Sequence, residues 1–74
     1  MQTEYNGYLI SSCSKQLSNR KYLVSCRISK NIDGKSKTVI FKDDEKTAMI
    51  LIEEAEKESI NFGKTLISKN VISF

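Results

Sequence analysis

Alternating apolar and polar side chains predict a strand over residues 22–30. A repeat of two residues is typical of a strand with one face buried in a core and the other open to solvent. We therefore expect the apolar side chains of this segment to point together into the core. These residues are Tyr22, Val24, Cys26 and Ile28.

A tight turn is predicted at Asp33 and Gly34, directly after this strand. Asp-Gly is a preferred pair for the type I′ turn, in which both central residues have a positive φ. A turn at this place pairs Cys26 with Phe41 in a returning strand over residues 36–42. Turn chemistry and hydrophobic pattern thus agree on one hairpin and on its register.

An earlier strand is predicted over residues 7–15, where Tyr8 and Ile10 share one face. With these two side chains in the core, Cys13 lies on the opposite face of the sheet from Cys26. Two thiols on opposite faces of a sheet are out of bonding reach. We expect both cysteines to be reduced, as is usual in a cytoplasmic protein.

After Lys42 the apolar residues recur at steps of three and four, which predicts a helix over residues 44–68. Asp43 or Asp44 is suited to cap its start. Gly63 falls on the buried side of this helix, and a break into two helices near it is the alternative. The predicted buried stripe consists of Ala48, Leu51, Ile52, Ala55, Ser59, Phe62 and Leu66.

These elements predict a single domain of the α+β class over residues 1–74. We expect a three-stranded antiparallel sheet in β-β-β-α order, with one long C-terminal helix packed on one face. The tail, residues 69–74, is apolar for a chain end. It is expected to pack back as a short strand or to contact a second subunit, with disorder as the third outcome. The helix is expected to cover Tyr22, Val24, Cys26, Ile28, Val39 and Phe41.

The composition excludes several classes of function. The chain contains no histidine and no tryptophan, which argues against histidine-based catalysis and most zinc sites. The helix carboxylates lie among lysines on its polar face, as solvated side chains do. The longest apolar run, Met49 to Ile52, is far shorter than the roughly 20 residues of a membrane span. We expect a cytoplasmic, non-enzymatic protein with no cofactor, metal or membrane contact.

Charge divides along the chain. Residues 1–42 carry eight Lys or Arg residues against two Asp or Glu residues, whereas residues 43–68 carry three against seven. Because the first part is predicted as sheet and the second as helix, the two sides of the molecule should differ in electrostatic potential.

The outer face of the predicted sheet is a candidate interaction surface, because no second helix is available to cover it. A chain of 74 residues also has a thin core and gains from burial against a second copy. We expect a homodimer formed through this face, the sheet edge or the C-terminal tail. The candidate face comprises Leu9, Leu23, Arg27, Ile40 and Lys42.

Nucleic-acid binding is the alternative, because basic residues cluster at the predicted turns. Such residues bind phosphate with little sequence preference. Lysines at turns and edges also discourage unwanted strand pairing, and no platform of stacking aromatic residues accompanies them. The candidate nucleic-acid contacts are Arg20, Lys21, Lys30, Lys35 and Lys37.

Two segments, residues 6–10 (Asn-Gly-Tyr-Leu-Ile) and residues 62–68 (Phe-Gly-Lys-Thr-Leu-Ile-Ser), resemble a family of short uncharacterised bacterial proteins. In that family a Gly-Tyr-x-Ile strand opens a three-stranded sheet, and the helix closes with Gly-Lys/Arg-x-Trp-Ile. Leu66 stands where the family usually has tryptophan. The resemblance implies the fold and no activity.

The architecture is also similar to the arm-binding domain of tyrosine recombinases, which uses its sheet on DNA. Architecture without matching site residues is a poor guide to function. The sequence favours a bacterial interaction module that self-associates, ahead of a small DNA- or RNA-binding accessory protein. An inhibitor protein of mobile-element origin is a third possibility.

Overall fold

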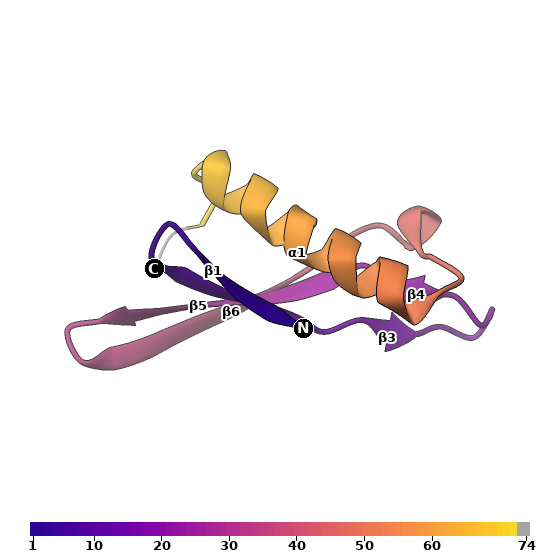
Figure 1. Cartoon of the computed structure of the whole chain (residues 1–74), viewed down its shortest axis with the longest axis horizontal. Coiled ribbons are helices and arrows are strands. Elements are labelled where there is room, and N and C mark those ends of the chain that lie inside the picture. The colour runs from indigo at the N-terminus through magenta and orange to yellow at the C-terminus, as the bar shows by residue number, and fades with distance from the viewer. Residues whose placement is uncertain (73–74) are drawn as a thin grey trace.

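A four-stranded antiparallel sheet carries one long helix on one of its faces in the computed structural model, which describes residues 1–72 (Figure 1). The strand order is β1-β2-β5-β6, and β3 and β4 form a separate two-stranded sheet. The α+β class and the C-terminal helix are therefore confirmed. The elements are β1 (Gln2–Tyr5), β2 (Tyr8–Ser12), β3 (Lys15–Gln16), β4 (Tyr22–Leu23), β5 (Ser25–Ile32), β6 (Lys35–Lys42), the 3₁₀ turn η1 (Glu45–Thr47) and α1 (Ile52–Ser68).

The predicted three-stranded sheet is wrong by one strand, because β1 pairs with β2 at the edge of the sheet. Asn6 and Gly7 form the connecting turn with φ values of 51° and 82°, and Tyr5 lies opposite Tyr8. Asn-Gly is as strong a signal for a type I′ turn as Asp-Gly. Thr3 and Tyr5 are half-buried and alternate with exposed residues, so the strand pattern is present in the sequence as well.

The central hairpin is confirmed in both its turn and its register. Asp33 and Gly34 have φ values of 52° and 78°, as a type I′ turn requires. Cys26 lies opposite Phe41 along the ladder of β5 and β6. Apolar side chains therefore meet on the face that α1 covers.

Two predicted strands are shorter or less regular than expected. The strand predicted over residues 7–15 ends at Ser12, and the one predicted over residues 22–30 is interrupted at Val24. The residues before the interruption form β4 and pair with β3, outside the main sheet. Strict alternation therefore fails here, and residues 23–26 are all buried.

The helix begins at Ile52, so the predicted start near residue 44 is wrong. Asp44 does act as a cap, but of the 3₁₀ turn η1, where its Oδ1 accepts a hydrogen bond from the backbone N–H of Lys46 at 2.9 Å. Met49 and Tyr22 then exchange two backbone hydrogen bonds at 2.6 and 2.9 Å. This bridge needs extended backbone, which prevents the helix from starting earlier.

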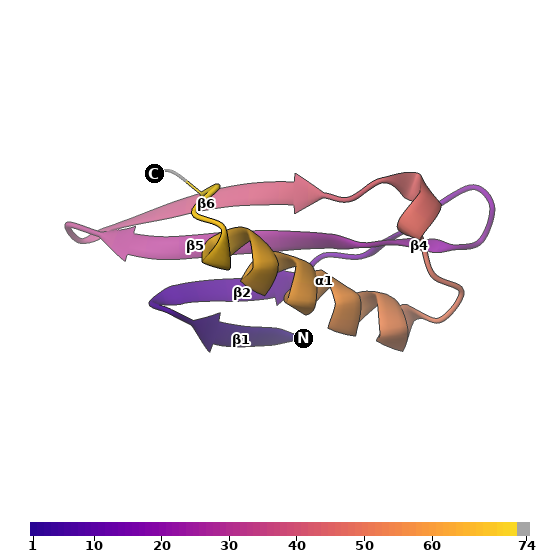
Figure 2. The same ribbon diagram turned by 90° about the horizontal axis from the view of Figure 1, so that it is seen from above.

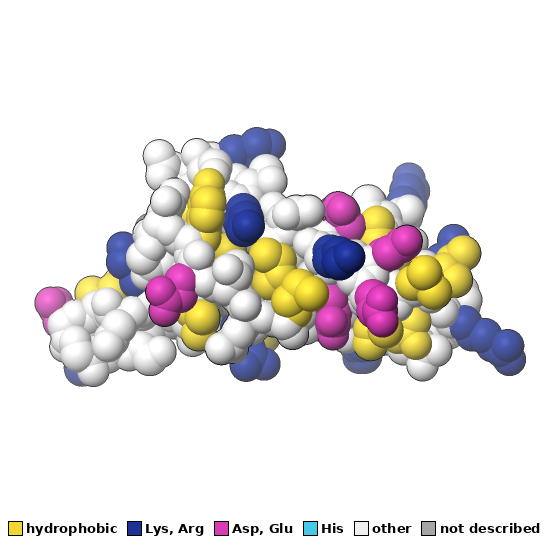
Figure 3. Space-filling model, viewed as in Figure 1, with side chains coloured by type: hydrophobic (Ala, Val, Ile, Leu, Met, Phe, Trp, Pro, Cys, Tyr) yellow, Lys and Arg dark blue, Asp and Glu magenta, His cyan; other side chains and the backbone are white. Residues whose placement is uncertain are grey.

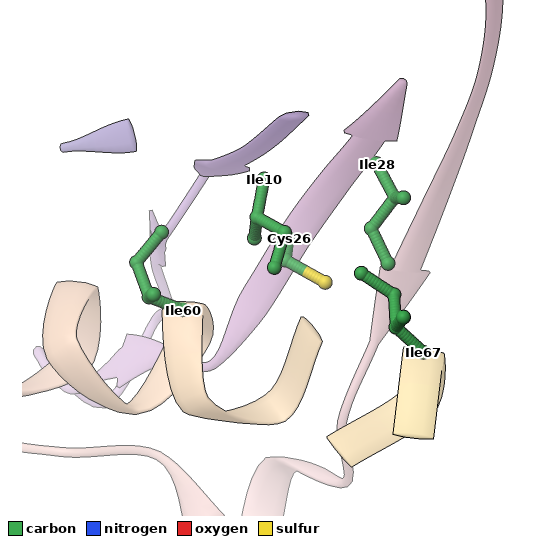
Figure 4. Packing of buried hydrophobic residues seen from close by; sticks show 5 residues of the cluster. All are labelled: Ile10, Cys26, Ile28, Ile60 and Ile67. Atoms are coloured by element: carbon green, nitrogen blue, oxygen red, sulfur yellow. The ribbon is translucent and has the colours of Figure 1, made fainter. Parts of the chain in front are cut away.

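Small side chains let α1 approach the sheet closely. Ala55, Ser59 and Gly63 are buried at steps of four residues, and α1 lies mainly over β2 and β5 (Figure 2). The helix runs without a break through Gly63, so the alternative of two helices is wrong. The buried cluster between the helix and the sheet comprises Ile10, Cys26 and Ile28 from the strands and Ile60 and Ile67 from α1 (Figure 4).

The end of α1 is a Schellman motif. Asn70 has a φ of 55°, its N–H bonds to the carbonyl of Ile67 at 3.1 Å, and the N–H of Val71 bonds to the carbonyl of Leu66 at 3.3 Å. Ile72 then packs against the core cluster. The tail thus packs back as a turn and not as a strand, while residues 73–74 lie outside the described part of the chain.

Candidate interaction surface

The outer face of the sheet is more polar than the sequence suggests. Arg27 and Ile40 lie directly opposite each other on this face and are exposed, as is Lys42. Leu9 is half-buried on β2. Leu23, however, is 7% exposed, so its predicted place on the open face is wrong.

Leu23 is buried because it lies outside the main sheet, which the chain re-enters only at Ser25. It belongs to β4 and pairs with Lys15. Val24, outside both neighbouring strands, accepts a hydrogen bond at its carbonyl from the N–H of Asp43 at 2.9 Å. The outer face therefore retains Ile40 as its one large exposed aliphatic residue among residues 1–72, at 53% exposure.

The two cysteines lie in different environments and both are free thiols, as expected. Cys13 is half-buried, and its Sγ lies 3.1 Å from Oγ of Ser25. Cys26 is fully buried under α1. Burial, with a smaller contribution from the nearby Cys13, raises the pKa of Cys26 to about 11. A thiol with such a pKa is protonated near neutral pH and is a poor nucleophile.

No group of three or more His, Cys, Asp or Glu side chains within residues 1–72 is arranged to hold a metal ion. Nor does any helix in this part of the chain have the length and apolarity needed to cross a membrane.

The basic residues proposed for nucleic acid are split between the two ends of the molecule, whose longest extent is 42 Å. Arg20 and Lys21 lie in the loop between β3 and β4, at one end. Lys30, Lys35 and Lys37 lie on the β5–β6 hairpin, whose turn forms the other end (Figure 1). Lys30 and Lys37 are opposite each other in the ladder. Only the hairpin group is brought together.

An aromatic ring accompanies this hairpin group. Nζ of Lys30 lies 4.6 Å from the centre of the Tyr8 ring, a cation–π distance. Nζ of Lys64 lies 5.8 Å from the ring of Tyr5, closer to the end of α1. Lys30 therefore already has an intramolecular partner.

β6 forms one edge of the sheet and α1 does not cover it (Figure 2). It is eight residues long, twice the length of β1 at the opposite edge. Its inward side chains Val39 and Phe41 pack against the core but remain partly exposed. The strand thus offers backbone hydrogen-bonding groups and apolar surface together.

A groove of about 400 Å³ lies between α1 and residues 43–49. Its apolar lining includes Val24, Met49 and Phe62, and the carboxylates of Asp43 and Glu58 lie at its wall. A second hollow, of about 500 Å³, is lined mainly by polar residues of β2, β5 and the hairpin turn.

Ile50, Leu51 and Ile52 form a second exposed apolar patch just before and at the start of α1. Their exposures are 74%, 58% and 46%. Leu51 and Ile52 were expected on the buried stripe of the helix, and this expectation is wrong because the helix starts too late to bury them. Figure 3 shows hydrophobic side chains at this end of the molecule and Asp and Glu side chains over the first half of α1.

No protein-family model, curated protein or solved structure matches the chain. The fold and the surfaces described above therefore carry the functional argument alone.

Proposed function

We propose that this protein is a non-enzymatic interaction module of the bacterial cytoplasm that associates with a second copy through the edge strand β6. The open edge carries the proposal, since β6 is an eight-residue strand at the edge of the sheet and Ile40, in its second half, is exposed. Strand edges of this kind are templates for pairing with another chain. Two free thiols agree with a reducing compartment.

The small size of the domain supports self-association. A domain of about 60 to 75 residues buries only roughly 60% of the surface of its unfolded chain. Here α1 covers β2 and β5, while Val39 and Phe41 on β6 remain half-buried. A second copy along β6 would remove this remaining apolar surface from water.

Sedimentation velocity over a concentration series from micromolar to millimolar tests the proposal. We expect a rise in mass toward a dimer in the native protein and a monomer in the variant Ile40→Arg. Ile50→Arg is the matched control, because it places the same charge on the other exposed apolar patch. A native protein that is monomeric throughout contradicts the proposal, as does an association that Ile50→Arg abolishes and Ile40→Arg leaves intact.

Nucleic-acid binding is a second candidate, favoured by the grouping of Lys30, Lys35 and Lys37 on one hairpin. Such a group would bind phosphates, with affinity that falls steeply with salt. Titration of labelled single-stranded and duplex oligonucleotides at low salt tests it. Loss of binding in Lys35→Gln but not in Lys21→Gln would support this hairpin as the contact, and no binding at low salt rules it out.

A further inference from the structure

The direction of the backbone groups on β6 determines which residues a second strand can bond. Ile32 and Lys35 flank the two-residue turn and form its hydrogen-bonded pair. Since bonded and non-bonded pairs alternate along an antiparallel ladder, the odd-numbered residues of β6 bond to β5. The hydrogen bond from the N–H of Asp43 to the carbonyl of Val24 continues this series. The even-numbered residues, which are Ser36, Thr38, Ile40 and Lys42, therefore direct their N–H and C=O groups toward the free edge.

The sequence around Ile40 is complementary to itself when it is read in the opposite direction. On the inner face, which α1 shares, β6 carries Lys37, Val39 and Phe41. Asp43, one residue beyond the end of β6, continues this row, since its N–H bonds to Val24 and its side chain lines the groove beside α1. Antiparallel to a copy of itself, this row places a lysine opposite an aspartate at each end and two apolar pairs between them. Opposite charges and apolar side chains that face each other across two strands both stabilise the pairing.

We propose that β6 pairs antiparallel with β6 of a second copy about a twofold axis at Ile40, with Lys37 opposite the partner's Asp43 and Val39 opposite the partner's Phe41. This inference rests on the proposed function and specifies its interface. Ile40 then meets the partner's Ile40 on the outer face. The two four-stranded sheets join into one sheet of eight strands, with both helices on the same face.

Neighbouring symmetric registers are much poorer. An axis at Val39 places Lys37 opposite the partner's Phe41, and an axis at Phe41 places Val39 opposite the partner's Asp43. Each of them sets a charge against an apolar side chain, which costs desolvation without an ion pair in return. The charges of this segment thus favour the register centred on Ile40 over its neighbours.

The lysines of β6 acquire a second role in this arrangement. Lysine on an edge strand normally discourages pairing. Here Lys37 disfavours pairing with a strand that places no acidic residue opposite it, but favours a second copy of β6, which places Asp43 there. This charge pair therefore makes the edge specific for a second copy of the same chain.

Charge exchange tests the register. Lys37→Glu and Asp43→Lys each place like charges opposite each other twice in a homodimer, and we expect the dimer Kd to rise about tenfold or more in each. An equimolar mixture of the two variants restores both opposite-charge pairs and should associate with a Kd near the native value. Lys21→Glu changes the net charge by the same amount as Lys37→Glu but at the other end of the molecule, and it should leave the Kd unchanged.

Cysteine crosslinking tests the same register independently of Asp43. In a Cys13→Ser background, we expect Ile40→Cys to form a disulfide-linked dimer on mild oxidation, because a bonded pair brings the two Cα atoms to about 5.5 Å. Thr38→Cys should not link to itself, since the two copies would lie about 13 Å apart. It should link to Lys42→Cys when the two variants are mixed.

The outcomes separate the register from the proposed function. Restored association on mixing, together with the Ile40→Cys link, supports the register. The register is overturned, and association through β6 is retained, if Ile40→Arg disrupts the dimer but two other results fail. These are recovery of association on mixing Lys37→Glu with Asp43→Lys, and the disulfide link of Ile40→Cys. A native protein that is monomeric at every concentration overturns both.

Discussion

The hydroxyl oxygen of Ser59 on α1 accepts a hydrogen bond from the backbone N–H of Ser25 at 3.0 Å. The same hydroxyl donates to the carbonyl of Ala55 one turn earlier, at 2.6 Å. Ser25 is the first residue of β5, and Ser59 is fully buried. One side chain thus joins the helix to the sheet at the point where the strand ladder is interrupted.

Replacement of Ser59 by alanine should lower the free energy of unfolding by about 1–3 kcal/mol, because it leaves the buried N–H of Ser25 without a partner. Urea unfolding measured by circular dichroism gives this value. Thr65→Ala is the matched control, since Thr65 also donates to a carbonyl four residues earlier, that of Asn61, but is exposed. We expect a change within about 0.5 kcal/mol for the control, and equal losses in both variants would contradict the bridging role of Ser59.

Gly63 marks the closest approach of helix and sheet. A Cβ at this position would lie 2.7 Å from Cγ2 of Ile10 and 3.4 Å from Sγ of Cys26. Ile10 is fully buried and its branched methyl has little room to move. We therefore expect Gly63→Ala to destabilise the fold by about 1–3 kcal/mol from overpacking, although alanine favours the helix by up to about 1 kcal/mol.

Asn61→Ala provides the control for Gly63→Ala, because alanine again replaces a weaker helix former but at an exposed position. It should stabilise the protein by a few tenths of a kcal/mol. Thermal unfolding of both variants compares the two effects directly. A stabilised Gly63→Ala variant would show that the core relaxes around the added methyl group.

Gly34 is required for a different reason. Its φ is 78°, and no atom lies within 4 Å of a Cβ placed there, so the constraint comes from the backbone alone. Gly34→Ala should cost about 1–2 kcal/mol, whereas Gly34→Asn should retain more of the stability, because asparagine tolerates the left-handed region. Chemical denaturation of the two variants tests this order. Equal losses would mean that side-chain contacts and not φ are limiting.

The buried thiol of Cys26 predicts a loss of stability at alkaline pH. Burial raises the pKa of this thiol from its ordinary value of 9.0 to about 11 in the folded protein. The folded state therefore holds this proton while the unfolded chain releases it. The stabilisation is complete below pH 9 and is lost as the pH rises toward 11, by about 1–3 kcal/mol.

Urea unfolding at several pH values from 8 to about 11 measures this loss. Lysines and tyrosines titrate in the same range, so the native protein is compared with Cys26→Ala, in which the decline should be smaller. Cys13→Ala should retain most of it, because burial and not the neighbouring thiol is the larger cause of the shift. Identical pH profiles for the native protein and Cys26→Ala would contradict the assignment.

Local signals predicted the central hairpin correctly, because the turn residues Asp33 and Gly34 and the apolar pair Cys26 and Phe41 specify the same register. The hairpin of β1 and β2 carries an equally strong Asn-Gly turn, but β1 is only four residues long and its alternation is brief. A strand this short is recognisable only when the turn signal is given more weight than the strand pattern.

The start of the helix depends on contacts far along the chain. The helical spacing extends back to Ala48, and nothing local stops the helix there. The bridge between Met49 and Tyr22 holds that segment extended. Pairing between residues so distant in sequence has no signature in either segment alone.

The candidate surface was predicted in part. Arg27, Ile40 and Lys42 lie exposed on the outer side of the sheet as expected, whereas Leu23 does not, because the strand is interrupted at Val24. The strand over residues 36–42 is an edge strand in the predicted three-stranded sheet as well. What the sequence did not predict is β1, which pairs with β2 and leaves β6 as the longer of the two edges.

The unequal lengths of the two edge strands bear on stoichiometry. β1 offers four residues and β6 offers eight. When two copies pair through their longer edges about a twofold axis, the longer edge of each copy is occupied by the other and is closed to a third copy. Association through β6 should therefore end at a pair, and a fibre would require the short edge of β1 to accept a strand as well.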